Sequence, residues 1–334
     1  MRTLRNAFLL AVIAIAALTG GAVAADLPQN RPTSDTAALE QRLLQARDLP
    51  AGQVQGFVAI PDQKGGVLIQ PQGRTFRDFR TGVQPWLDAV LIVVAVAAMV
   101  ALYLFAGPMR VARDPEGRTV QRFTGFERFI HWLTAVSFIW LALTGLNLVF
   151  GRWLLLPMMG ENAFSGLSAL AKLSHNFVGF AFMLGLAAMT VQWLRYNLPS
   201  RLDIAWIKAG GGMFGGLHPP ARKFNAGQKM IYWLAVFGGG AISLTGIALL
   251  MPFTVLDITG MQVMQVLHSV ISALMIAVVI GHIYLGTIGI RGSFEAMSTG
   301  RVDRNWAHEH HGLWLEEEDA KGRGAGAAPM RPAE

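Results

Sequence analysis

Two histidines on one long apolar segment are the side chains in this sequence best placed to do chemistry. His268 and His282 lie 14 residues apart within the apolar stretch Val263–Ile290. An α-helix rises about 1.5 Å and turns about 100° per residue, so the two imidazoles are expected about 21 Å apart along the axis and about 40° apart around it. A helix of this length can cross the roughly 30 Å hydrocarbon core of a bilayer. Because imidazole in a membrane is costly, the pair predicts two functional sites at two depths.

The composition is that of a membrane protein. Of the 334 residues, 53% are hydrophobic and only 15% are charged, which predicts an all-α integral membrane protein rather than a soluble domain. The sequence has no cysteine, which excludes disulfides, cysteine-bound iron–sulfur clusters and covalently attached c-type haem. A redox metal held by this chain would therefore be bound non-covalently, with histidine as the expected ligand.

Changes in composition divide the chain into five segments. Residues 1–25 combine a basic head, a short apolar stretch and a small-residue end, which predicts a secretory signal peptide; a retained N-terminal helix is the alternative. Residues 26–84 are polar and are expected in the periplasm. Residues 85–106 predict an extra transmembrane helix, residues 107–291 a four-helix core, and residues 292–334 a charged, mobile cytoplasmic tail. The tail histidines are predicted to be solvated, with a weak metal site as the alternative; they are His308, His310 and His311.

Five apolar runs are each near the length that a transmembrane helix needs. They are Trp86–Phe105, Phe129–Phe150, Leu173–Leu194, Met230–Met251 and Val263–Ile290. Lysine and arginine gather in the loops after the first and third runs, while the loop after the second carries only Arg152 and Lys172 and the loop after the fourth carries none. The positive-inside rule then predicts a bacterial inner-membrane protein with a periplasmic N-terminal segment and a cytoplasmic C-terminus. This topology accounts for the net charge of +7 without nucleic acid.

Depth in the membrane pairs the four histidines that lie within the apolar runs, while His218, in a cytoplasmic loop, is predicted to be solvated. His131 and His282 are predicted near the cytoplasmic face, and His175 and His268 near the periplasmic face. Two pairs at two depths predict two b-type haems, each with two axial histidines. Two strong ligands leave no open position on the metal, which favours electron transfer. Hydrogen bonding between helices or a proton relay are the alternatives for these histidines.

Several neighbouring residues have two interpretations. Glycines at 179, 281 and 238–240 could make room for a flat macrocycle or could allow close helix packing. Arg122 and Arg128, close to His131, could balance haem propionates or could serve only the positive-inside pattern.

Three motifs give the chain a family resemblance. The segment 126–132, Phe-Glu-Arg-Phe-Ile-His-Trp, resembles the first ligand motif of the cytochrome b (gamma) subunit of membrane-bound respiratory formate dehydrogenase. The segment 223–229, Lys-Phe-Asn-Ala-Gly-Gln-Lys, is similar to a loop of that family, and Leu267-His268 with Gly281-His282-Ile283-Tyr284 resembles its double-ligand helix. The resemblance covers about residues 124–301. The leader, the periplasmic segment and the first span lie outside it.

The resemblance implies a membrane-anchoring subunit of formate dehydrogenase. It implies one haem between His175 and His268, a second between His131 and His282, and electron transfer from an iron–sulfur (beta) subunit to quinone. The exported catalytic (alpha) subunit would oxidise formate, since this chain has no pterin-binding or large soluble domain. The quinone would bind beside the second haem, in a loop whose contacting residues are implied to be Asn225, Gly227 and Gln228. A helix cap is the alternative role of that loop.

Two other functions remain open at this point. The cytochrome b subunit of another quinone-linked oxidoreductase, such as a nickel–iron hydrogenase, shares the four-helix, multi-histidine plan, and only the loop motif separates the two. A proton-coupled transporter would use the histidines as a relay, but such proteins often have internal repeats and broken helices, which the sequence does not indicate.

Overall fold

A computed structural model of the chain describes residues 71–109, 115–212 and 219–326. The predicted signal peptide, and the predicted periplasmic segment up to residue 70, lie outside the described residues. Contacts divide the chain into two units, Met1–Val83 and Gln84–Glu334. In the first unit the described part forms helix α4 (Pro71–Asp78) and the π-helix η1 (Phe79–Val83). The second unit contains the four histidines discussed above.

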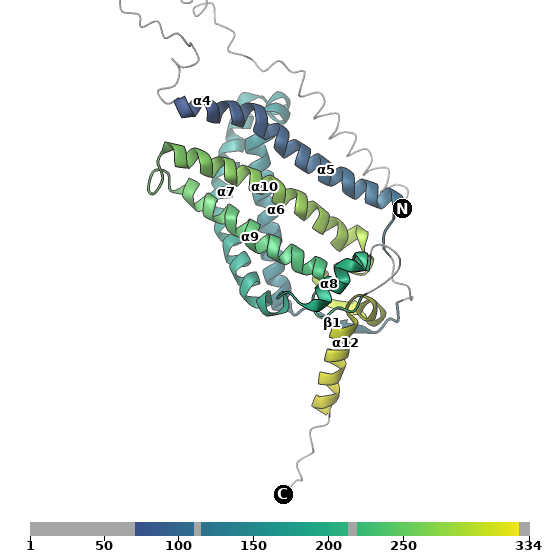
Figure 1. Ribbon diagram of the computed structural model, residues 1–334. Coiled ribbons are helices and arrows are strands. Elements are labelled where there is room, and N and C mark those ends of the chain that lie inside the picture. Colours follow the sequence, from purple (N-terminus) through teal and green to yellow (C-terminus); the bar gives the residue numbers. More distant parts are fainter. Residues whose placement is uncertain (1–70, 110–114, 213–218, 327–334) are drawn as a thin grey trace, which may run out of the picture. The chain divides into compact units, whose positions relative to one another are not determined.

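The second unit is a bundle of long helices (Figure 1). Helix α6 packs against α7, α7 against α9, α9 against α10, and α10 against α5. In the part of the chain that the structure describes, five helices are long and apolar enough to cross a membrane, which confirms the predicted fold class. The helices are α5 (Gln84–Phe105), α6 (Gly125–Leu154), α7 (Leu156–Trp193), α9 (Ala226–Leu250) and α10 (Ile258–Tyr284).

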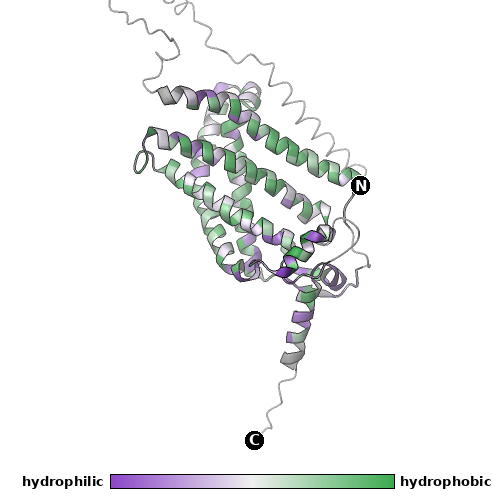
Figure 2. Ribbon diagram, viewed as in Figure 1, coloured by the Kyte–Doolittle hydropathy of each residue, from purple (hydrophilic) through white to green (hydrophobic). Residues whose placement is uncertain are grey.

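Hydrophobic residues predominate along the long helices of this bundle, as Figure 2 shows by colour, and many of them are exposed. Leu143, Leu184, Val191 and Leu244 are each 60% exposed or more. In water such a surface would be unfavourable, whereas a lipid environment tolerates it. The helix starts are specified locally: Thr124 caps α6 and Asp257 caps α10 through side-chain oxygens that accept backbone N–H groups.

Helix α7 is longer than the sequence predicts. The predicted span begins at Leu173, but the helix begins at Leu156, with a break at Gly160, whose φ is 78°. Only glycine adopts such a backbone readily. The segment expected as a loop after the second span is therefore mostly helical, and the turn between α6 and α7 is short.

Short elements gather at one end of the bundle, called the tail end below. Strand β1 (Thr119–Gln121) pairs antiparallel with β2 (Arg301–Asp303), with Val120 opposite Val302. The other elements here are η2 (Leu194–Tyr196), α8 (Arg201–Lys208), η3 (Gly210–Gly212), η4 (Leu285–Gly289), α11 (Phe294–Ser298) and α12 (Arg304–Gly326). The opposite end, where α6 meets α7 and α9 meets α10, is called the turn end.

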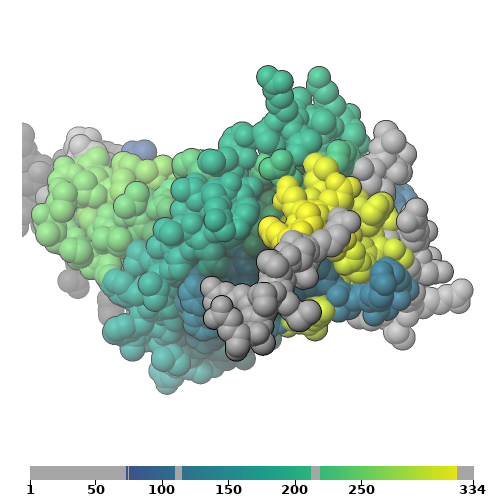
Figure 3. Space-filling view, turned by 90° about the horizontal axis from the view of Figure 1, so that it is seen from below, coloured from purple at the N-terminus to yellow at the C-terminus, as the bar shows by residue number. Residues whose placement is uncertain are grey.

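The prediction of a mobile tail with solvated histidines is wrong for much of this segment. Residues 304–326 form α12, and Figure 3 shows the C-terminal segment (yellow) packed beside earlier parts of the chain. His308 is exposed as expected, but His310 stacks on Trp306 with ring centroids 4.7 Å apart, and His311 is only 1% exposed. The tail therefore folds onto the bundle.

A buried arginine explains why the tail folds there. The guanidinium of Arg122 donates to the Lys223 carbonyl at 2.7 Å and lies 2.9 Å from Nε2 of His311. It also lies over the rings of Trp306 and Trp314, at 5.6 and 5.1 Å. Burial lowers the pKa of Arg122 to about 9. We call Arg122, Trp306, His311 and Trp314 the tail cluster.

Candidate cofactor site

The structure brings the four histidines together in the two pairs that depth predicts. The imidazole centroids of His131 and His282 are 6.2 Å apart, and those of His175 and His268 are 6.3 Å apart. Helix α10 contributes one ring to each pair, while α6 and α7 contribute the others. One helix therefore forms a shared wall of two sites, one near each end of the bundle.

These separations fit one metal ion between each pair of rings. A metal–imidazole nitrogen bond is about 2.0–2.1 Å long, and with roughly 1.1 Å from each nitrogen to its ring centroid the expected centroid separation is about 6.3 Å. Two rings in direct hydrogen bond or stacking contact would be closer. Among the polar contacts of the described residues, no hydrogen bond joins the rings within either pair.

The backbone arrangement leaves room for a group larger than an ion. The helix pairs that share histidines, α6 with α10 and α7 with α10, are not among the closely packed pairs of this bundle. Three of the rings are only partly buried by protein, and His282 is exposed. Both observations fit a flat macrocycle inserted between facing histidines, which is how helical bundles hold such cofactors.

A threonine on α6 orients His175. The Thr144 Oγ1 atom lies 2.8 Å from Nδ1 of His175 and 2.8 Å from the carbonyl oxygen of Trp140 on its own helix. The carbonyl can only accept, so the hydroxyl proton points at Trp140 and Oγ1 accepts the Nδ1 proton. Nε2 of His175 then carries the lone pair and faces away from Thr144, as a metal ligand requires.

A threonine on α9 orients His268 in the same way. Thr245 Oγ1 is 2.9 Å from Nδ1 of His268 and 2.8 Å from the carbonyl oxygen of Ala241. Its hydroxyl proton is again directed to its own helix, and Nδ1 of the histidine donates. Both threonines are buried, at 6% and 7% exposure, so water does not compete for these bonds.

A glycine follows each threonine and lies against the same ring. A Cβ at Gly145 would be 3.7 Å from Cε1 of His175, and a Cβ at Gly246 would be 3.3 Å from Cε1 of His268. The contact of a Thr-Gly pair with each of these histidines was not predicted, although the sequence contains a signal for it. The tripeptide Leu-Thr-Gly occurs at 143–145 and again at 244–246, in two different spans.

The second pair lacks this support. Nδ1 of His131 is buried without a hydrogen-bond partner in the described part of the chain. The His131 ring makes an edge contact with Trp132, at a centroid separation of 5.3 Å. One turn earlier on α6, Glu127 is held by Lys223 Nζ at 2.5 Å and by Trp193 Nε1 at 3.1 Å.

The glycines selected from sequence divide between the two interpretations. A Cβ at Gly238 would clash with Met275 on α10, and one at Gly239 would press on Leu186 of α7, so both allow close helix packing. Gly179 faces open space, and Gly281 has only Met99 at 3.9 Å. Both arginines make contacts with other parts of the protein. Arg122 belongs to the tail cluster, and Arg128 donates to the Ser298 carbonyl at 2.6 Å.

The loop at 225–228 begins α9 with a capping box. Oδ1 of Asn225 accepts from the Gln228 backbone N–H at 3.0 Å, and Oε1 of Gln228 accepts from the Asn225 N–H at 3.2 Å. Gly227 is required by the indole of Trp206 on α8, which would lie 2.9 Å from a Cβ there. Asn225 and Gln228 therefore cap the helix, and the capping box involves the side-chain oxygen of each residue.

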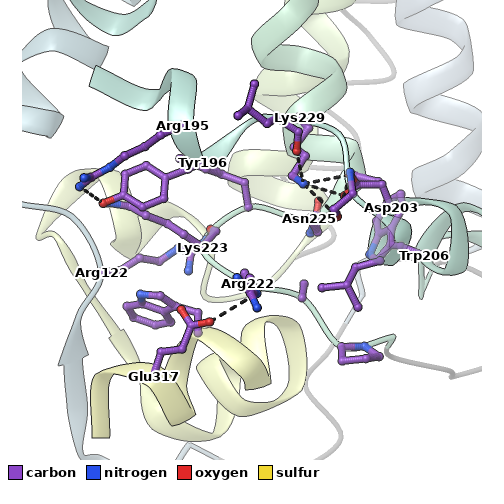
Figure 4. A pocket seen from close by; sticks show the side chains of 18 of the residues that line it. Arg122, Arg195, Tyr196, Asp203, Trp206, Arg222, Lys223, Asn225, Lys229 and Glu317 are labelled. Atoms are coloured by element: carbon purple, nitrogen blue, oxygen red, sulfur yellow. Dashed lines mark hydrogen bonds and ion pairs between the residues drawn. The ribbon is translucent and has the colours of Figure 1, made fainter. Parts of the chain in front are cut away.

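A pocket of about 820 Å³ opens beside this loop at the tail end (Figure 4). Asn225 lines it, together with Trp206, Lys223 and the ion pair between Lys229 and Asp203 at 2.9 Å. Gly227, Gln228 and the histidines are not among its lining residues. The His131–His282 pair therefore does not line this pocket.

A membrane bundle with two pairs of facing histidines is the arrangement of a membrane-bound cytochrome. The model of the prokaryotic cytochrome b561 family matches residues 122–300, more than half of the chain, and the chain belongs to this family. Membership implies a haem b cofactor. The match covers α6 to α10, so α5 lies outside it.

Curated relatives agree with this assignment. The chain is 30% identical over 204 residues to the formate dehydrogenase cytochrome b556(fdo) subunit of Escherichia coli strain K12, covering 60% of this chain and 93% of that protein. It is 27% identical over 210 residues to the nitrate-inducible cytochrome b556(Fdn) subunit of the same strain, with the same coverage. The cytochrome b556 subunit of the Haemophilus influenzae enzyme is 26% identical over 196 residues. The resemblance to formate dehydrogenase cytochrome b subunits is confirmed.

Proposed function

We propose that this chain is the membrane-anchoring cytochrome b subunit of a formate dehydrogenase and that it holds two b haems. The observation that carries the proposal is the pair of ring separations, 6.2 and 6.3 Å, at two levels of one bundle. Formate as the substrate of the complex rests on the names of the relatives. Catalysis with formate is assigned to a partner.

The histidines of each pair would hold one haem through both axial positions. When bound, such a haem supplies a one-electron carrier with no open position for a substrate. Rings 14 residues apart on α10 put the two sites about 21 Å apart along the bundle, close enough to the membrane thickness to connect its two sides. The Leu-Thr-Gly segments of α6 and α9 would keep the turn-end rings in the ligating orientation.

The charge distribution supports a cytoplasmic tail end and a periplasmic turn end. Basic side chains at the tail end include Arg118, Arg122, Arg195, Lys208 and Lys223, whereas toward the turn end α6 and α7 carry Arg152, in the last turn of α6, and Lys172. The chain would then lie in the bacterial inner membrane with its signal peptide (1–25) and segment 26–84 exported, and α12 in the cytoplasm. An iron–sulfur partner and the exported catalytic subunit would dock at the turn end.

Quinone is proposed to bind at the tail end near the His131–His282 pair. Quinone carbonyls need hydrogen-bond donors, and the capping box at 225–228 leaves the side-chain NH2 groups of Asn225 and Gln228 available. Gly227 lies between them, where the indole of Trp206 packs against its backbone. At this end the protons for quinone reduction would come from the cytoplasm.

Haem content tests the proposal directly. The purified full-length protein should give a reduced-minus-oxidised b-type spectrum with two haems per chain. His131→Ala and His282→Ala should remove the same haem, and His175→Ala and His268→Ala the other, while the exposed tail residue His308→Ala should remove neither. One haem per chain, or loss that follows another pairing, would contradict the assignment of the site.

A deletion strain tests the substrate. Membranes that lack this chain should lose formate-dependent quinone reduction and keep hydrogen-dependent reduction. The reverse result would assign the chain to a hydrogenase. Co-purification followed by identification of the bound subunits should recover an iron–sulfur protein.

A further inference from the structure

The two histidine pairs differ in what their outer nitrogens contact. Both turn-end rings, His175 and His268, are hydrogen-bonded at Nδ1 by a buried threonine, at 2.8 and 2.9 Å. At the tail end, Nδ1 of His131 is buried with no partner in the residues that the structure describes. The chemistry of the four ligands is the same, so the difference lies in their surroundings.

Such a bond changes the ligand. When Nδ1 donates to an acceptor, electron density moves toward Nε2, and the imidazole becomes a stronger donor to a metal. A stronger donor stabilises the oxidised metal more than the reduced metal, so the reduction potential falls. Both histidines of the turn-end pair have this feature, and His131 of the tail-end pair lacks it.

We propose that Thr144 and Thr245 are positioning residues that lower the midpoint potential of the turn-end haem below that of the tail-end haem. Each threonine would act on the haem through its histidine and would not contact the haem itself. The inference rests on the proposed pairs of haem ligands, and it gives electron transfer between the two haems a direction. Electrons that enter at the turn end would move toward the site of higher potential at the tail end.

The threonine hydroxyls are suited to this role because they cannot turn away. Each is buried, and each hydroxyl proton is directed at carbonyls of its own helix, Trp140 and Leu141 for Thr144, and Ala241 and Ile242 for Thr245. The oxygen is therefore left as an acceptor that faces the ring. The second occurrence of Leu-Thr-Gly provides the same acceptor on the opposite side of the turn-end site.

The test is an optical redox titration of the full-length protein and its variants. Thr144→Val and Thr245→Val keep the shape of the side chain and remove the threonine oxygen, while the backbone carbonyls of Leu141 and Ile242, which also accept from the two rings, remain. We expect each to raise the midpoint of the turn-end component and to leave the other component unchanged, with a larger shift in the double variant. Thr144→Ser and Thr245→Ser should restore the original value. Thr190→Val is the matched control, since among the described residues the Thr190 hydroxyl bonds the Leu186 carbonyl of its own helix and no histidine.

A second measurement does not depend on the threonine variants binding haem. His175→Ala should leave only the tail-end haem, and the midpoint that remains should be the higher of the two in the unmodified protein. Retention of the lower midpoint, an unchanged turn-end component in both valine variants, or an equal shift of both components would overturn the inference. The absence of any b-type spectrum would instead overturn the proposed function.

Discussion

Ser269 donates a hydrogen bond of 3.1 Å to the carboxyl group of Asp88, which joins α10 to α5 one residue away from His268. Asp88 is 2% exposed, and the Gln84 amide, one turn earlier on α5, contacts both residues. The family match begins at residue 122, so α5 is additional to it. Between apolar helices a polar contact of this kind fixes how one helix lies on another.

Removal of the Asp88 carboxyl group should loosen α5 from α10. Asp88→Ala leaves the Ser269 hydroxyl without its acceptor and the Gln84 amide with Ser269 as its remaining partner, at a cost of about 1–3 kcal/mol. Thermal unfolding in detergent should show a lower midpoint, and Ser269→Ala in the same background should add little. Asp78→Ala, at an exposed position, is the control. Fully additive effects of the two core changes would show that the residues do not act together.

The tail cluster should make stability depend on pH below neutrality. Burial and the charge of Arg122 hold the pKa of His311 well below its usual value. An unfolded histidine binds a proton near pH 6.5, whereas the folded one stays neutral, so the unfolded state gains protons as pH falls and stability decreases. Thermal unfolding between pH 8 and 5 should show a decline that begins near pH 6.5. His311→Gln should flatten this decline; an unchanged slope would assign it to other groups.

The pairing of the histidines could be predicted because it depends only on helix geometry. A rise of about 1.5 Å per residue fixes the depth of each ring, and the four depths match in pairs. That these rings hold haem stays a prediction, supported by the 6.2 and 6.3 Å separations. The threonines were missed because their role depends on how α6 and α9 rotate toward α7 and α10, which hydropathy does not encode.

The folded tail could not be predicted from its polarity. Residues 304–321 are largely polar, and their burial comes from contacts of Trp306 and Trp314 with the distant Arg122. The helix is broken at His311, between the two tryptophans, so helical spacing alone does not place them on one face. The sequence did not identify Arg122 as the partner of the two tryptophans, because an arginine in a basic loop is already explained by the positive-inside rule. The length of α7 was underestimated because its first turns, residues 156–172, are helical but interrupt their apolar residues with glycine and polar residues, so they fall outside the continuous apolar run.

The buried ion pair beside His131 should be sensitive to the loss of either charge. Glu127 and Lys223 are 2.5 Å apart with side-chain exposures of 9% and 15%. Lys223→Met leaves a buried carboxylate without its partner, and the free energy of unfolding should fall by about 3–5 kcal/mol. Thermal unfolding should show a large loss. Lys321→Met is the control, since its pair with Glu318 is exposed and should contribute almost nothing. Similar losses in both variants would contradict the role of burial.

Gly246 should be required for the turn-end site for steric reasons. A Cβ there would be 3.3 Å from Cε1 of His268, closer than most real Cβ contacts, so a larger side chain must push the ring away from its partner. Gly246→Ala should broaden or shift the spectrum of the turn-end haem, and Gly246→Val should remove that haem while the tail-end haem remains. Gly240→Ala, at a position of the same helix with open space, should leave both haems unchanged. Haem extraction with a reduced-minus-oxidised spectrum measures each outcome. Retention of two normal haems in Gly246→Val would show that His268 does not need its present position.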